Sequence, residues 1–183
     1  MMAYFFIAAG IILRIIPHLP NFAPIAAMAL FGGVYLNKKY ALLIPLLALF
    51  LSDIFIGFYS PWIMLSVYGS FALIGVMGLY LRKHKNAINI IGATLIGSII
   101  FFLITNFAVW AAPYSFYPHT FQGLMQSYLM GLPFFRNTLM GDLFYTGAMF
   151  GLMEIAIKTT NTWEIKKERN GFYFKKMARK RIQ

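Results

Sequence analysis

The sequence contains no cysteine and few charged residues, and both shortages exclude whole classes of protein. Without a thiol, the chain has no disulfide framework, thiolate metal site or cysteine nucleophile. Charged residues make up 11% of the 183 residues, whereas soluble domains have about 25%. The three histidines, His18, His84 and His119, are far apart and show no metal-ligand spacing. These shortages exclude an ordinary soluble enzyme and a disordered chain, and they predict no metal site.

Hydrophobic residues make up 60% of the chain, and its mean hydropathy is +0.70. They fall in long runs, too many for one core of this size, which predicts an all-α membrane protein with six transmembrane helices. The six apolar segments cover residues 3–16, 24–36, 40–57, 62–81, 87–110 and 137–157. The last four have the roughly 20 residues that a bilayer crossing needs. The first two are short, and a proline-rich break at residues 17–24 separates them, so they either cross fully or form a re-entrant hairpin.

The net charge of +11 comes from basic residues whose positions match the topology of a membrane protein. Fourteen of the 16 lie after segments two, four and six, which six crossings would place on one side of the membrane. The excess of Lys and Arg in cytoplasmic loops then predicts that both termini are cytoplasmic. Residues 1–6 carry no basic region of a signal peptide, so we expect no cleavage. The predicted location is the bacterial plasma (inner) membrane, with multiple crossings.

We expect two regions, a transmembrane domain over residues 1–160 and a basic cytoplasmic tail over residues 161–183. The tail has eight basic and two acidic residues, mixed with aromatic side chains. Such a segment next to a membrane is typical of contact with anionic lipid. A docking site for a cytoplasmic partner is the alternative, and RNA binding is a distant third, so no nucleic-acid partner is predicted.

Four ionisable residues are not explained by topology. Arg14, Asp53, Arg136 and Asp142 all fall near the outer ends of their segments, at the same predicted depth. Charges at membrane depth face a bundle interior or a watery cavity and find partners there. Two interpretations remain open, and both can hold for one cluster. Either two ion bridges join the first, third and sixth helices, or the charges form a pocket in which Arg14 pairs with Asp142 or with an anionic group.

Further polar residues are predicted at this depth. Asn106 and Trp110 share a helical face, so Asn106 could read hydrogen bonds of a ligand and Trp110 could stack on it. Trp110 alone also fits an interfacial aromatic belt. Asn137 is predicted at the start of the sixth helix. His18 and Asn21 lie in the proline-rich break, a feature that marks binding sites in transporters, although a plain extracellular turn is the alternative.

Residues 121–129 have the spacing of an amphipathic helix, which we expect to lie in the outer interface. Small residues four apart predict close helix packing. Such pairs occur at Ala29 and Gly33, Ala93 and Gly97, and Gly147 and Gly151. No P-loop, HExxH or GxSxG motif is present and no nucleophile has a base at its depth. We therefore expect no enzyme activity and no cofactor.

Three strings carry a resemblance to known proteins. Residues 14–33 (RIIPHLPNFAPIAAMALFGG), 105–110 (TNFAVW) and 137–147 (NTLMGDLFYTG) resemble a bacterial family of uncharacterised six-helix proteins described as transport proteins. The six-helix architecture also resembles the substrate-binding S components of energy-coupling-factor transporters. That resemblance implies a pocket opening outward, with contacts from the first loop and from the outer ends of the last three helices, where Trp62 lies as well.

The sequence thus predicts a transport protein, similar to an S component, that binds a small polar solute from outside for uptake. The predicted substrate-binding residues are Arg14, His18, Asn21, Asp53, Trp62, Asn106, Trp110, Arg136, Asn137 and Asp142. The expected partners are the lipid bilayer, the solute, and either coupling subunits or further copies of the chain. The alternative is a structural or assembly membrane protein whose polar cluster only locks the helices together.

Overall fold

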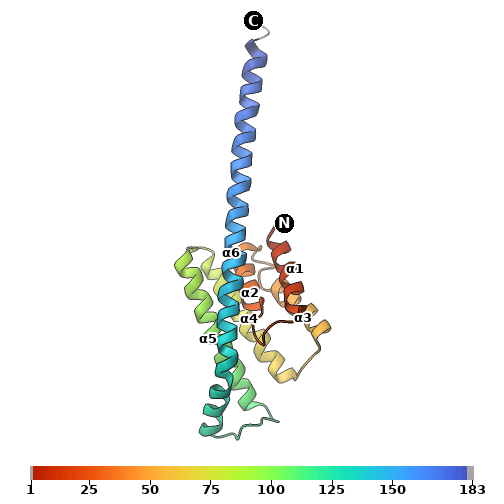
Figure 1. Cartoon of the computed structure of the whole chain (residues 1–183), viewed down its shortest axis with the longest axis vertical. Coiled ribbons are helices and arrows are strands. Elements are labelled where there is room, and N and C mark those ends of the chain that lie inside the picture. Colours follow the sequence, from red (N-terminus) through yellow and green to blue (C-terminus); the bar gives the residue numbers. More distant parts are fainter. Residues whose placement is uncertain (1, 181–183) are drawn as a thin grey trace. The chain divides into compact units, whose positions relative to one another are not determined.

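The computed structural model describes the backbone of residues 2–180 and the side chains of residues 2–160 and 162. Within that range it contains six α-helices and no β-strand, so the predicted all-α fold of six helices is confirmed. The helices are α1 (Met2–Ile15), α2 (Ile25–Tyr35), α3 (Leu43–Ile56), α4 (Pro61–Leu81), α5 (Ala87–Ala111) and α6 (Phe121–Lys180) (Figure 1).

The chain forms two compact units, Met1–Met149 and Phe150–Gln183. The first unit contains α1 to α5 and the beginning of α6. In the second unit the backbone stays helical as far as Lys180. The predicted contact between the basic tail and anionic lipid depends on side chains outside the described part.

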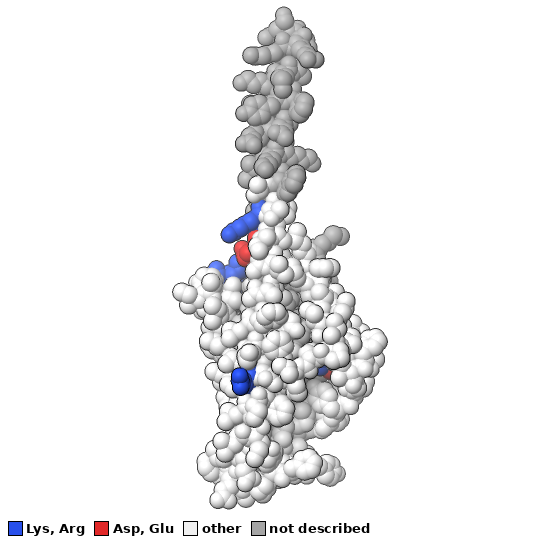
Figure 2. Space-filling view, viewed as in Figure 1, with Lys and Arg blue, Asp and Glu red and all other residues white. Residues whose placement is uncertain are grey.

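Two helices, α4 with 21 residues and α5 with 25, are long and apolar enough to cross a membrane. Only 28% and 17% of their most apolar stretches are buried, so most of this apolar surface faces outward. The face of the first unit seen in Figure 2 is almost entirely uncharged. A membrane environment accounts for apolar helix faces that other helices leave uncovered.

The third segment is shorter than the sequence predicts. A helix over residues 40–57 would have crossed a bilayer, but α3 has 14 residues and is about 21 Å long at 1.5 Å per residue. Residues 38–42 form a turn before it. Gly57, with φ of 106°, ends it in a conformation that other residues rarely adopt. Six complete crossings therefore stay a prediction.

Helix α2 lies in the middle of the first unit, where it contacts α1, α3, α4 and α5 (Figure 1). All ten of its residues from Ile25 to Val34 are buried. Its sequence is apolar on every side, which suits a helix surrounded by other helices. The short second segment is therefore the central element of the bundle.

Glycines let α2 and α4 approach each other closely. A Cβ atom at Gly33 would lie 2.6 Å from the Cα of Gly78, and a Cβ at Gly78 would lie 2.9 Å from the Cα of Gly33. Of the small-residue pairs predicted to pack, the pair on α2 thus makes a backbone contact. Gly147, in contrast, has open space around it.

The helix expected over residues 121–129 is present, but it is not separate from the sixth segment. These residues are the first turns of α6, which continues through Pro133. Side chains of this stretch bind α5 instead of lying apart from it. The Ser127 hydroxyl donates to the carbonyl oxygen of Asn106 (2.8 Å), and the Tyr128 hydroxyl donates to that of Leu103 (3.1 Å).

The loops that follow α2 and α4 lie at the same end of the first unit. Arg82, just after α4, donates to the carbonyl oxygens of Gly33 (2.7 Å) and Leu36 at the end of α2. Lys85 donates to the Tyr35 hydroxyl (3.3 Å). We call this end the basic end, and its loops carry Lys38, Lys39, Arg82, Lys83 and Lys85.

Candidate functional site

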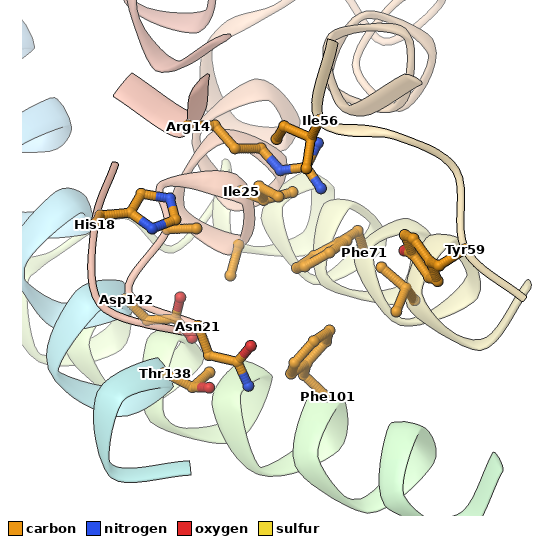
Figure 3. A pocket seen from close by; sticks show the side chains of 13 residues that line it. Arg14, His18, Asn21, Ile25, Ile56, Tyr59, Phe71, Phe101, Thr138 and Asp142 are labelled. Atoms are coloured by element: carbon orange, nitrogen blue, oxygen red, sulfur yellow. The ribbon is translucent and has the colours of Figure 1, made fainter. Parts of the chain in front are cut away.

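A cavity of about 340 Å³ lies away from the basic end, beside the start of α2 and the middle of α4 and α5. Its walls come from the last residues of α1 and α3, the proline-rich break, and the facing parts of α4, α5 and α6. We call it the main cavity. Its polar lining consists of Arg14, His18, Asn21, Tyr59, Thr138 and Asp142. Figure 3 shows these side chains together with the apolar ones that complete the wall.

Arg14 is held on one side of the main cavity by residues of α3. Its Nη2 lies 2.7 Å from Oδ1 of Asp53, and only 12% of the Arg14 side chain is exposed. Its Nη1 donates to the carbonyl oxygen of Leu49 (3.2 Å) and to the hydroxyl of Ser52. The Tyr68 hydroxyl of α4 donates to Oδ2 of Asp53 (2.6 Å). This network joins α1, α3 and α4, and its inner member Asp53 is fully buried.

Of the two ion bridges in the first interpretation, only the one between α1 and α3 is present among the side chains described. Arg14 pairs with Asp53, and no ion pair involves Arg136 or Asp142 in that range. Arg136 and Asp142 are six residues apart on α6, which separates them by about 240° around a helix with 100° per residue. Because Asp142 faces inward, Arg136 faces outward and is exposed.

Asp142 faces the main cavity from α6 and is 3% exposed. The Ser98 hydroxyl of α5 donates to its Oδ2 (2.6 Å). No other hydrogen bond reaches this carboxyl group from the described side chains or backbone. Figure 3 shows Asp142 on the same side of the cavity as His18, Asn21 and Thr138.

The proline-rich break is fixed against α6. Asn21 has φ of 63°, a left-handed conformation that Asn tolerates better than most residues. Nδ2 of Asn137 donates to the carbonyl oxygen of Pro20 (3.0 Å). The ring of Phe22 packs against Tyr145, with centroids 5.5 Å apart. A Cβ at Gly141 would lie 3.1 Å from the Cα of Phe22, so this glycine admits the break to the helix surface.

A second cavity of about 260 Å³ adjoins the main one, and we call it the side cavity. The two share four lining residues, Asn21, Val67, Phe101 and Thr138. Asn106 lines the side cavity, and its Nδ2 donates to the carbonyl oxygen of Phe102 (2.8 Å). Gly131 of α6 makes room for it, because a Cβ there would lie 2.8 Å from Cγ of Asn106.

The remaining predicted site residues line neither cavity. Nε1 of Trp62 donates to the carbonyl oxygen of Ala108 (3.1 Å), which ties α4 to α5. Nε1 of Trp110 donates to that of Pro118 (3.0 Å), and its ring meets His119 edge-on. Arg136 is exposed and Asn137 binds the break. Asn137 lies within α6 and not at its start, because the helix already begins at Phe121.

Sequence reasoning missed several residues that shape the site. Tyr68 completes the ion-pair network, Ser98 binds Asp142, and the stacked rings of Phe71 and Phe101 form an apolar wall. Tyr59 lies in the loop after α3; burial and the Asp53 carboxylate raise its pKa to about 12, so its phenol stays neutral. The signal for Ser98 was a hydroxyl facing inward on an apolar helix. Among 19 phenylalanines, nothing in the sequence marked Phe71 and Phe101 as the ones that form the wall.

The model of a family of unknown function, DUF6580, matches residues 1–165, and the chain therefore belongs to that family. No curated protein and no solved structure matches the chain. The described residues contain no group of three or more His, Asp or Glu side chains that could hold a metal ion.

Proposed function

Because membership of a family of unknown function gives no activity, we propose the function from the main cavity. The chain is a multi-pass protein of the bacterial plasma membrane that binds a small polar solute in this cavity and takes part in its uptake, as an S component does. The observation that carries the proposal is a cavity with ionisable and hydrogen-bonding side chains inside an otherwise apolar bundle. Its volume is at the lower end of the about 300–1,000 Å³ found for small-molecule sites.

The hydrogen bonds of Arg82 and Lys85 support the orientation, because they bring two basic loops to one end. Positively charged loops stay in the cytoplasm, so the basic end is inside and the main cavity opens outward. The outward-facing apolar surfaces of α4 and α5 support the multi-pass arrangement.

Cysteine labelling tests this orientation directly, because the chain has no cysteine of its own. We expect Phe116→Cys, in a fully exposed loop position, to react with a membrane-impermeant maleimide on intact cells. His84→Cys at the basic end should react only after the membrane is opened. Labelling of His84→Cys on intact cells would contradict the orientation.

Solute binding is tested with the full-length protein in detergent or nanodiscs, by thermal shift across amines, carboxylates, sugars and amino acids. Thr138→Val should weaken any hit at least tenfold, because Thr138 lines both cavities and a buried polar partner would be lost. Thr94→Val is the matched control. Both threonines are buried and donate to the carbonyl four residues earlier, but Thr94 lines neither cavity. Equal effects of the two substitutions, or no hit in any class, would refute the proposal.

One observation favours the alternative, a structural membrane protein. The network of Arg14, Asp53 and Tyr68 satisfies its own charges and joins three helices without any ligand. If this is its entire role, Arg14→Ala lowers stability while no small molecule raises the melting temperature. Asn106→Ala separates the two functions, because Asn106 takes no part in the network but lines the side cavity. The substitution should weaken solute binding if the protein binds a solute there, and a purely structural protein would show no such binding to weaken.

A further inference from the structure

Asp142 is a buried carboxyl group whose only hydrogen bond, within the described part of the chain, comes from Ser98. Taking an ionised carboxylate out of water costs several kcal/mol or more unless a partner compensates it. The Ser98 hydroxyl supplies one hydrogen bond and no charge. The position therefore lacks the positive charge that normally accompanies a buried acid.

Apart from His18, the residues that line the main cavity offer no spare basic group for Asp142. The one permanently charged basic residue of this lining, Arg14, is bound to Asp53, so these two charges cancel. His18 is the remaining basic group in the lining, and it is exposed. With His18 neutral and Asp142 ionised, the cavity and its immediate support would carry one net negative charge, that of Asp142.

Aromatic rings complete the surroundings of this charge. Phe71 and Phe101 both line the main cavity and stack at a centroid distance of 5.1 Å with 22° between their planes. Figure 3 shows the two rings across the cavity from His18. The outer faces of such rings attract cations, and quaternary ammonium groups are recognised in proteins by aromatic cages.

We propose that the solute of the main cavity carries an ammonium group, for which Asp142 is the counter-ion and Phe71 and Phe101 are the apolar wall. This inference rests on the proposed solute-binding function and specifies its substrate class. Ser98 is a positioning residue, because its hydrogen bond fixes Oδ2 of Asp142 and leaves Oδ1 to meet the ligand.

The test uses pairs of probes that differ in charge and little in shape. Choline is compared with 3,3-dimethylbutan-1-ol, and benzylamine with benzyl alcohol and benzoate. Binding to the full-length wild-type protein is measured by calorimetry or ligand-observed NMR, with NaCl and MgCl2 added in parallel to detect inorganic cations. We expect each ammonium probe to bind at least tenfold more tightly than its neutral partner.

Asp142→Asn removes the charge but keeps the shape and an oxygen that accepts from Ser98. It should abolish the preference for the ammonium probe without lowering the melting temperature of the free protein. Glu154→Gln is the matched control, because it removes one carboxylate from a residue that lines neither cavity. If Asp142→Asn fails to fold, the probe pairs on the wild-type protein still decide the question.

The outcomes distinguish failure of the ammonium assignment from failure of the proposed solute-binding function. Equal binding of charged and neutral probes, preference for benzoate, or displacement of amines by sodium or magnesium ions alone would overturn the ammonium assignment and leave solute binding intact. If Asp142→Asn still prefers the ammonium probe over its neutral partner, Asp142 is not the counter-ion, and the ammonium assignment is also overturned. Failure of every solute class to bind would refute the proposed function itself.

Discussion

Replacing Asp53 with Asn tests whether the Arg14–Asp53 ion pair holds α1 against α3. The substitution removes one charge, keeps the size of the side chain, and leaves an oxygen to accept from Tyr68. Arg14 then lacks its counter-ion but stays beside the Ser52 hydroxyl and the Leu49 carbonyl oxygen. Any loss of stability therefore reports mainly the missing charge.

The structure sets the size and order of the effects. Two unit charges 2.7 Å apart attract by about 6 kcal/mol at an effective dielectric constant of about 20, before desolvation is subtracted. Breaking a buried pair costs about 3–5 kcal/mol. The loss of stability in Asp53→Asn should be about 3 kcal/mol, at the low end of that range. The reason is that Arg14 is 12% exposed and faces the main cavity, where water can reach it. Arg14→Met should cost about 5 kcal/mol, because it leaves a fully buried carboxylate behind.

Thermal unfolding of the two single variants and the double variant in one detergent measures these terms. At about 2–4 °C per kcal/mol for a chain of this size, Asp53→Asn should lower the melting temperature by about 6–12 °C. The double variant should be more stable than the sum of the single losses predicts, by about 2 kcal/mol or more, because it buries no unpaired charge. Arg136→Met, at an exposed arginine with no ion pair to a described side chain, is the control and should change stability by less than about 0.5 kcal/mol.

Two results would refute this reasoning. Strict additivity in the double variant would show that the two charges do not stabilise each other. A loss in Asp53→Asn no larger than that in Arg136→Met would show that the buried pair contributes nothing to the fold.

Two further predictions compare glycines within one helix. Gly78→Ala should destabilise the protein by about 1–3 kcal/mol, because its Cβ would meet the backbone of α2. Gly69→Ala, in open space on the same helix, should stabilise the protein by about 0.5–1 kcal/mol. If the two substitutions shift the melting temperature in the same direction, the close approach of α2 and α4 at Gly78 is contradicted. Gly131→Ala should displace the Asn106 side chain and lower the melting temperature, whereas Gly147→Ala should not. Two results together would contradict the close fit of Asn106 against α6. Gly131→Ala would leave the melting temperature unchanged, and it would not alter the effect of Asn106→Ala on solute binding.

Much of the fold followed from the pattern of apolar residues. Segment positions agree with α1, α2, α4 and α5 within a residue or two, because long apolar runs bounded by polar or proline-containing loops have few alternatives to helices. The continuity of α6 was not predictable, because Pro133 lies inside the helix and proline normally interrupts one. Side chains of its first turns bind α5.

Of the ten predicted site residues, four line the main cavity, and their pairing was not predicted. Arg14, His18, Asn21 and Asp142 line one cavity, since ionisable and polar groups in an apolar bundle gather away from lipid. Depth along the sequence could not reveal that Arg14 pairs with Asp53 and that no described basic side chain pairs with Asp142. That choice depends on how α1, α3 and α6 are rotated about their axes.

The amino-acid sequence by itself determined the helical class, the positions of most helices and the concentration of basic residues in particular loops, because these depend on local hydropathy and charge. Only the tertiary structure decided that the short second helix is central, that Gly33 and Gly78 touch, and that Asp142 faces a cavity beside two phenylalanine rings. The physical reason is that helix rotation and contact are set by the packing of side chains far apart in the chain, which no local pattern contains.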